Sequence, residues 1–345
     1  MKILNFFAGA TILAGVMTAC DSDIEAEQIT HPLVYDSQYY QNLRDYKESE
    51  HSIAFGWFAG YGTQHSGGVR FLNLPDSLDI VSLWGGIPAK EETQIWEEIR
   101  FVQQVKGTRM LVVAITSFDR EEETLEFRKV YDESQKLPEG SDERTAMENK
   151  AMEMYAEYFL DQVFENDLDG FDIDYEPSND IMSNEKRAPH FILHMAKYLG
   201  PNPYQTKEER LKLIEERYGK EVASRPGVCD KMLCIDQPNA VFADYKKYID
   251  YYFFQTYSGD AHEGELKICL GWPEEKVVYC TNMGGGWKGK MEAMYEQAAY
   301  QPANGKRKGG FGTFYIHRDY TIHENNPEPY YRFRQCIQIQ NPAIR

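Results

Sequence analysis

The sequence predicts an α/β fold, a closed (β/α)8 TIM barrel in a single domain with loop and helix insertions. Eight short apolar runs recur along the chain, and helix-like segments lie between most of them. Strands that alternate with helices pair in parallel, and eight such units close into a barrel. The 345 residues, 42% of them hydrophobic, suffice for the core of such a domain, and no repeat or linker divides them. The runs are residues 52–60, 78–86, 109–118, 170–176, 231–236, 248–259, 276–285 and 309–318.

The segments between the runs account for the helices of this prediction. In residues 91–105 the apolar side chains Ile95 and Ile99 recur at the spacing of one helix face. Two charged segments are additional to the eight strand-helix units of a minimal barrel. Residues 119–144 predict an insertion or a long helix with a Pro-Gly turn, and residues 206–221 predict an extra exposed helix. Such charged faces are usually solvated, so we assign them no chemistry. The other helical segments are residues 146–164, 188–200 and 330–340.

The N-terminus predicts a leader rather than a part of the barrel. Residues 1–19 hold one basic residue, an apolar run and then small residues, the pattern of a secretory signal peptide. The small residues before Cys20 resemble a bacterial lipobox, so we expect lipidation of Cys20; ordinary cleavage with a free Cys20 is the alternative. Residues 20–45 then form an acidic tether, and residues 46–345 form the barrel. We therefore expect a lipid-anchored protein of the cell envelope, in the outer membrane and exposed at the surface.

Charge and composition narrow the classes of partner. A formal net charge of -18 argues against nucleic acid or an anionic membrane surface, which leaves the lipid as the only expected membrane contact. Aromatic residues make up 14% of the chain, and 24 of them are tyrosines. Aromatic faces with polar edges suit neutral polymers such as sugars. We expect a monomer that acts on such a sugar.

The cysteines indicate neither a metal site nor a fixed disulfide. Cys234 and Cys280 lie in apolar strand-like runs, which favours buried thiols. A bridge between Cys229 and Cys269 is conceivable, but the sequence supports no particular pairing. No pair of CxxC motifs is present, so a zinc site is not expected. We expect no metal and no cofactor.

The stretch LDGFDIDYEP, residues 168–177, carries the strongest chemical signal. Strand-forming residues alternate with acids, so Asp172, Asp174 and Glu176 share one face at a period of two. Carboxylates on one buried face repel each other and resist desolvation, so stability alone does not select this pattern. A calcium loop is the rival interpretation, but such loops have polar spacers and a glycine turn where this stretch has Phe171 and Ile173.

The barrel gives these acids a place and a chemistry. Phe171, Ile173 and Tyr175 should point outward to the helices, while the acids point inward and step towards the C-terminal rim, where active sites of this fold lie. Glu176 would be the exposed acid. Proton sharing along the row would keep it protonated, as a general acid for glycoside hydrolysis requires. Asp169 has the opposite parity, so we expect it to bond backbone or a neighbour near the strand start.

Asp169-x-x-Asp172-x-Asp174-x-Glu176, with Gly170 in the first gap, resembles the DxxDxDxE signature of glycoside hydrolase family 18. The resemblance implies that Glu176 is the proton donor. It implies that Asp174 orients the substrate's 2-acetamido group, whose carbonyl oxygen attacks the anomeric carbon, and that Asp172 holds Asp174. No enzyme nucleophile is then required, an exception among glycosidases.

A second element separates the members of this family. Gln255 and Tyr257 resemble the Gln-x-Tyr of its endo-β-N-acetylglucosaminidases, in which the tyrosine bonds the acetamido oxygen; buried core packing is the alternative. Ser258 follows where chitinases more often have aspartate. Their Ser-x-Gly-Gly on the third strand is also absent, and Phe314 and Tyr315 stand where they tend to have tryptophan. We also assign Trp57 and Asn282, near strand ends, to substrate binding, with Trp84 and Trp287 as further stacking rings; core or rim packing is the alternative for each tryptophan.

The resulting prediction is an endo-β-N-acetylglucosaminidase that cleaves the GlcNAc-GlcNAc core of N-glycans with retention. A chitinase or another GlcNAc hydrolase is the first alternative. A non-catalytic surface glycan-binding lipoprotein is the second, although the retained Asp174 and Glu176 argue against it.

Overall fold

The structure is a computed structural model, and it divides the chain into two units, Met1–Ser37 and Gln38–Arg345. The second unit contains the barrel. In the part of the chain that is described, no helix combines the length and apolarity needed to cross a membrane. The described residues are 35–62, 69–118, 121, 123–176, 182, 187–237, 242–257, 271–285, 291–303, 305–322 and 326–342.

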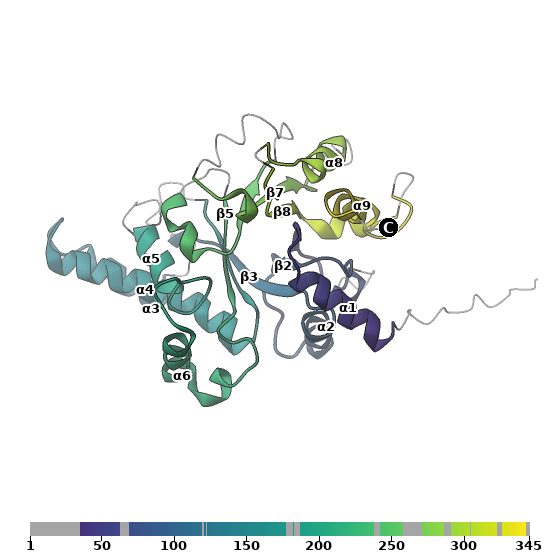
Figure 1. The fold of residues 1–345 in the computed structure, drawn as a ribbon. Coiled ribbons are helices and arrows are strands. Elements are labelled where there is room, and N and C mark those ends of the chain that lie inside the picture. Colours follow the sequence, from purple (N-terminus) through teal and green to yellow (C-terminus); the bar gives the residue numbers. More distant parts are fainter. Residues whose placement is uncertain are drawn as a thin grey trace, which may run out of the picture. The chain divides into compact units, whose positions relative to one another are not determined.

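The predicted (β/α)8 barrel is confirmed (Figure 1). Each strand pairs in parallel with the next along the chain, and the eighth closes the sheet on the first, with Ile53 opposite Gly310. Every strand coincides with one of the apolar runs, and only β5 passes the end of its run, by one residue. The strands are β1 (Ile53–Phe58), β2 (Ile80–Leu83), β3 (Arg109–Ile115), β4 (Gly170–Asp174), β5 (Met232–Gln237), β6 (Tyr252–Gln255), β7 (Val277–Asn282) and β8 (Gly310–Phe314).

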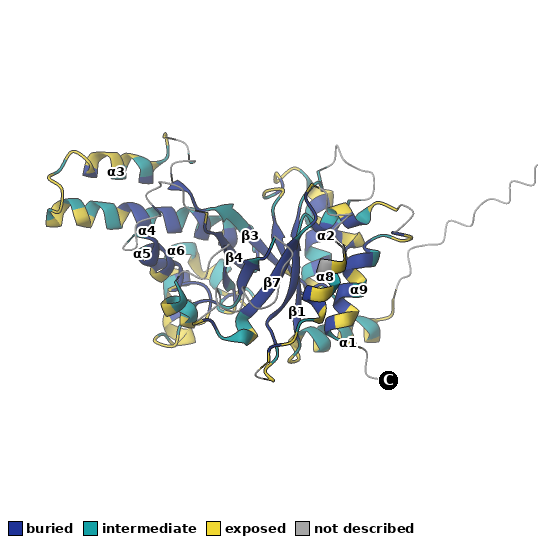
Figure 2. Cartoon of the chain, turned by 90° about the horizontal axis from the view of Figure 1, so that it is seen from above, coloured by how far each residue is buried: buried dark blue, intermediate teal, exposed yellow. Residues whose placement is uncertain are grey.

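The helices include all those predicted from periodicity. The charged segment 119–144 holds a short helix and, after Gly140 at φ 76°, the start of a long one that Ser141 caps. Both helices extend beyond the strands (Figures 1 and 2). The α-helices are α1 (Ser37–Glu48), α2 (Thr93–Gln104), α3 (Glu126–Ser134), α4 (Asp142–Glu165), α5 (Arg187–Met195), α6 (Lys207–Ala223), α8 (Met291–Ala299) and α9 (Tyr331–Gln340). The 3-10 helices are η2 (Phe71–Asn73), η5 (Ala243–Tyr248), η6 (Glu274–Lys276) and η8 (Ile316–Tyr320).

Helix α1 begins at Ser37, within the residues 20–45 that we predicted as a tether. This helix has no fully buried residue, and Tyr40, Leu43 and Tyr46 on one of its faces are half-buried, with the Tyr40 ring 5.8 Å from that of Phe101. Polar side chains attach it to the barrel as well: the Arg44 guanidinium donates to the Val105 carbonyl at 2.8 Å, and Lys47 Nζ donates to the Leu78 carbonyl at 2.8 Å. The sequence prediction also contained no equivalent of α8.

The core has two parts, one on each face of the sheet. Inside the barrel, Phe55 stacks on Phe253 with ring centroids 3.6 Å apart, and Cys234 and Cys280 are buried free thiols, as predicted. Outside it, Phe171 and Ile173 belong to the larger cluster beneath the helices, which confirms the predicted facing of β4. Figure 2 shows the strands in the buried colour and the helices with exposed residues along one side. Cys269 lies outside the described residues.

The start of β4 is fixed by close contacts that the sequence partly predicted. A Cβ on Gly170 would lie 2.2 Å from the Met232 carbonyl oxygen, so only glycine lets β5 approach this closely. Asp169 accepts hydrogen bonds from the Met110 N–H at 2.8 Å and from Gln103 Nε2 at 2.7 Å. This confirms that Asp169 bonds backbone and a neighbour near the strand start. Both residues hold the base of the strand that carries the acids.

Candidate active site

The acids of β4 become more exposed towards the C-terminal rim, in the predicted order. Asp172 is fully buried, Asp174 is 2% exposed, and Glu176 is exposed two residues beyond the strand. Thr116 holds the last residue of the strand through two hydrogen bonds to the Asp174 carbonyl, from its N–H at 2.8 Å and from its Oγ1 at 3.0 Å. The strand therefore ends with a solvent-facing carboxyl above two buried ones.

Asp172 has its own set of donors inside the barrel. Its Oδ2 accepts from the Ser82 hydroxyl at 2.7 Å and from the Trp57 indole N–H at 3.1 Å. Burial raises the pKa of Asp172 to about 7, against the two hydrogen bonds, which act to lower it. Near neutral pH this carboxyl is therefore balanced between its acid and anion forms, a state suited to sharing a proton with its neighbour.

Asp236 is a fourth carboxyl of the site, and the sequence analysis missed it. It is fully buried on β5, opposite Asp174 in the register of the parallel pair. Gln255 Nε2 donates to its Oδ1 from the end of β6. Burial and the charges of Asp174 and Asp172 raise the pKa of Asp236 well above its usual range. The signal was present: Asp236 is an acid within the apolar run 231–236, as Ser82 is a polar residue within 78–86.

Gln255 is the last residue of β6, and Tyr257 lies two residues beyond it. Both are half-buried. Burial raises the pKa of the Tyr257 phenol, so it stays a hydrogen-bond donor at physiological pH. Its ring lies 6.1 Å from that of Phe314, centroid to centroid. The structure thus brings the Gln-x-Tyr pair to the acids of β4 and β5.

Partly exposed rings surround Phe314 at the end of β8. Tyr315 stacks on it at 3.9 Å between centroids, and Trp84 approaches it edge-on at 5.0 Å. Trp57 differs from the expectation of a sugar-stacking ring: it is 1% exposed and lies below Phe314 as the donor to Asp172. A tryptophan on the inner face of β1 is covered by the opposite strands, whereas one past the end of β2 is not.

Asn282 lies at the end of β7, next to Phe314 in register. It is half-buried, and its Oδ1 accepts from the Gly284 N–H, so in the structure it holds the turn that follows its own strand. Its predicted role in substrate binding stays a prediction. Trp287 and Ser258 lie outside the described residues.

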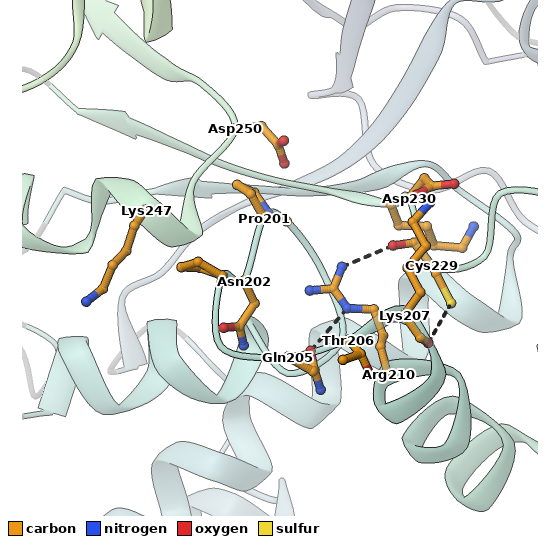
Figure 3. Close-up of a pocket in the computed structure, with 13 residues that line it drawn as sticks. Pro201, Asn202, Gln205, Thr206, Lys207, Arg210, Cys229, Asp230, Lys247 and Asp250 are labelled. Atoms are coloured by element: carbon orange, nitrogen blue, oxygen red, sulfur yellow. Dashed lines mark hydrogen bonds and ion pairs between the residues drawn. The ribbon is translucent and has the colours of Figure 1, made fainter.

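A separate cavity of about 580 Å³ lies by the loops that lead into β5 and β6, at the other end of the strands (Figure 3). Its cationic side chains already have partners. Arg210 Nη1 donates to the Cys229 carbonyl at 3.0 Å, and Lys207 Nζ pairs with Asp230 Oδ1 at 2.5 Å. We assign it no catalytic role, because its half-buried carboxyl, Asp250, already accepts from the Leu233 N–H at 2.9 Å at the start of β5.

Comparison with known families identifies the class of protein that this fold and site define, a glycoside hydrolase. The family described as "Glycoside hydrolase family 18, BT1044-like" matches residues 22–269. The chain belongs to glycoside hydrolase family 18. No curated protein matches it.

Solved structures share the fold at low sequence identity. A glutamate-to-glutamine variant of BT1044 has a TM-score of 0.63 and 22% identity, over 89% of this chain and 93% of that one. The endo-β-N-acetylglucosaminidase of Cordyceps militaris has a TM-score of 0.62 and 20% identity, over 89% and 97%. A chitinase of Bacteroides thetaiotaomicron has a TM-score of 0.50 and 11% identity, over 86% and 99%.

Proposed function

We propose that this family 18 hydrolase is an endo-β-N-acetylglucosaminidase that cleaves the β-1,4 bond between the two core GlcNAc residues of N-glycans. The observation that carries the proposal is the graded burial of the acids on β4. Glu176 is exposed at the rim, directly after the buried Asp174 and Asp172. One solvent-facing acid above a buried anion is what substrate-assisted hydrolysis needs, because the substrate supplies the nucleophile.

The mechanism uses Glu176 twice, first as an acid and then as a base. Glu176 donates a proton to the glycosidic oxygen as the bond to the anomeric carbon breaks. The acetamido carbonyl oxygen of the same sugar attacks that carbon and closes an oxazolinium ring, which the negative charge of Asp174 stabilises and the Tyr257 hydroxyl orients. Water, deprotonated by Glu176, then opens the ring, so the anomeric configuration is retained.

The identity of the β6 residues favours the endoglycosidase over a chitinase. Gln255 and Tyr257 lie together at the site, and Phe314 with Tyr315 forms the aromatic end of β8. The likeness to the Cordyceps militaris enzyme supports this choice, since a variant of that enzyme was solved in complex with fucosyl-N-acetylglucosamine-Asn. A chitinase is the second candidate, favoured by the fold it shares with chitinases.

Glu176→Gln provides the test of the mechanism. It keeps the size of the side chain and removes the transferable proton, so turnover should fall at least a hundredfold, the ordinary contribution of a general acid. Binding of a GlcNAc-containing oligosaccharide should remain within a few-fold of wild type. Lys129→Gln, an exposed position on α3, is the matched control. Unchanged turnover in Glu176→Gln would remove this residue from the mechanism.

We further propose that Cys20 carries a lipid that holds the enzyme at the outer membrane surface, where glycans arrive from outside. The lipobox-like residues before Cys20 and the acidic stretch after it support this. Labelled fatty acid should be incorporated into the wild-type chain and not into Cys20→Ala. Equal labelling of both chains would contradict the anchor.

A further inference from the structure

Asp236 has no part in the mechanism above, although it lies next to the residues that do. The parallel register puts it opposite Asp174 on β4 and opposite Phe253 on β6. Register partners of a parallel sheet project to the same face, so its carboxyl lies inside the barrel with that of Asp174. It is fully buried there.

The two carboxyl oxygens of Asp236 have different surroundings. Oδ1 accepts from Gln255 Nε2, whereas Oδ2 is buried and has no hydrogen-bond partner among the described residues. A buried anionic oxygen without a donor is costly, because it loses its hydration and receives nothing in return. A protonated Oδ2 carries no charge and can donate. The asymmetry fits a neutral acid whose proton is on Oδ2.

The groups that face Asp236 favour the same form. The titratable groups with the largest effect on its pKa are acids, and each of them acts to raise it. Burial first, and then the charge on Asp174, raise the pKa of Asp236 well above its usual range. The facing groups are Asp172, Asp174 and Glu176 from β4 and its end, Tyr257 from the end of β6, and Cys280 from β7.

We propose that Asp236 is a positioning residue of the active site: as a neutral acid it fixes the side-chain amide of Gln255 and leaves the negative charge to Asp174. An uncharged neighbour adds no repulsion to Asp174, so Asp174 can carry the anion that the acetamido group requires. The hydrogen bond also turns the Gln255 NH2 group towards β5, and its carbonyl end is left for other partners. The part concerning the acetamido group rests on the proposed function.

The first test measures stability and needs no substrate. Asn has the shape of a neutral aspartic acid and can still accept from Gln255. In the wild type the folded chain holds a proton at Asp236 that the unfolded chain releases above its ordinary pKa, so stability falls as pH rises. The unfolding equilibrium constant of Asp236→Asn, relative to wild type, should therefore decrease by about tenfold per pH unit between pH 5 and pH 7. Urea titrations at four pH values measure it.

Asp76→Asn is the control for this measurement. Asp76 pairs with Lys106 Nζ at 2.7 Å and accepts from the Tyr39 hydroxyl at 2.6 Å, far along the chain from the site. Burial acts to raise the pKa of Asp76, but the Lys106 ammonium and these hydrogen bonds lower it below its usual value. Above pH 5, Asp76 is therefore ionised in both the folded and the unfolded chain. The unfolding equilibrium constant of Asp76→Asn, relative to wild type, should stay constant between pH 5 and pH 7. A constant ratio for Asp236→Asn as well would overturn the proposal.

The second test measures turnover on a GlcNAc-GlcNAc glycan. Asp236→Asn should keep kcat within about threefold of wild type, while Asp236→Ala, which removes the acceptor for Gln255, should lower kcat at least tenfold with a smaller change in KM. Equal losses of kcat in both variants would mean that the site needs an anionic Asp236. A wild-type kcat in Asp236→Ala would mean that the Asp236 side chain positions nothing. Either result overturns the proposal. If the wild type cleaves no such glycan, the proposed function fails while the stability test still decides the state of Asp236.

Discussion

Removing the Ser82 hydroxyl tests the electrostatics of the carboxyl row most cleanly. Ser82 is fully buried, and its Oγ donates to Asp172 Oδ2 at 2.7 Å. The bond is stronger when Asp172 is an anion, since a hydrogen bond to a charged group contributes about 1.5–3 kcal/mol and a neutral one about 1 kcal/mol. Ser82→Ala should therefore cost about 1 kcal/mol at pH 5, where Asp172 is protonated, and about 2–3 kcal/mol at pH 9, where it is ionised.

The direction of this pH dependence follows from the pKa of Asp172, which is about 7 in the folded chain and has an ordinary value of 3.8. A carboxyl with a raised pKa costs stability as pH rises from about 4 through 7, and loss of a donor to the anion enlarges that cost. In Ser82→Ala the pKa of Asp172 should rise by a further unit or so, since 1.36 kcal/mol corresponds to one unit. The pH profile of kcat/KM should shift with it.

Urea unfolding of both chains at pH 5 and pH 9 measures the difference, and Ser134→Ala is the matched control. Ser134 is equally buried, but its hydroxyl donates to the neutral Tyr131 carbonyl at 2.5 Å. Its loss should be the same at both pH values. If the cost of Ser82→Ala were also independent of pH, Asp172 would not ionise in this range, and the assigned origin of its pKa would be refuted.

The remaining predictions concern the packing of β4, the substrate-assisted mechanism and the independence of turnover from metal ions. Gly170→Ala should destabilise the fold by about 3 kcal/mol, because its Cβ would meet the Met232 carbonyl oxygen at 2.2 Å, while Gly62→Ala, with no atom within 4 Å, should change the urea midpoint little. A thiazoline mimic of the oxazolinium intermediate should inhibit competitively, and indifference to it in steady-state assays would argue for an enzyme nucleophile. EDTA should leave turnover unchanged; a loss restored by added calcium would revive the metal interpretation.

The fold was predictable because its signals are local. Strand runs and helical periodicity are properties of short segments, and their alternation leaves little choice of topology. The exceptions have local reasons too. α1 has no fully buried side chain and is attached in part by the polar side chains of Arg44 and Lys47, so burial of apolar residues accounts for only part of its attachment.

The site was predictable only within one strand. The spacing of Asp172, Asp174 and Glu176 fixes their common face from the sequence alone. The partners Ser82 and Asp236 come from other strands, and nothing in the sequence states which residues face each other across the barrel. The same limit explains Trp57, whose burial depends on the opposite strands and whose indole serves Asp172.

The most direct test of the central claim is mass spectrometry of a glycoprotein panel incubated with the chain lacking residues 1–20, beside its Glu176→Gln variant. We expect a product that retains a single GlcNAc on asparagine with the wild type, and intact glycans with the variant. Intact glycans with both, together with cleavage of chitooligosaccharides by the wild type, would contradict the endoglycosidase and select the chitinase. Glycans that are bound but not cleaved, with chitooligosaccharides also left intact, would contradict the catalytic role of Glu176.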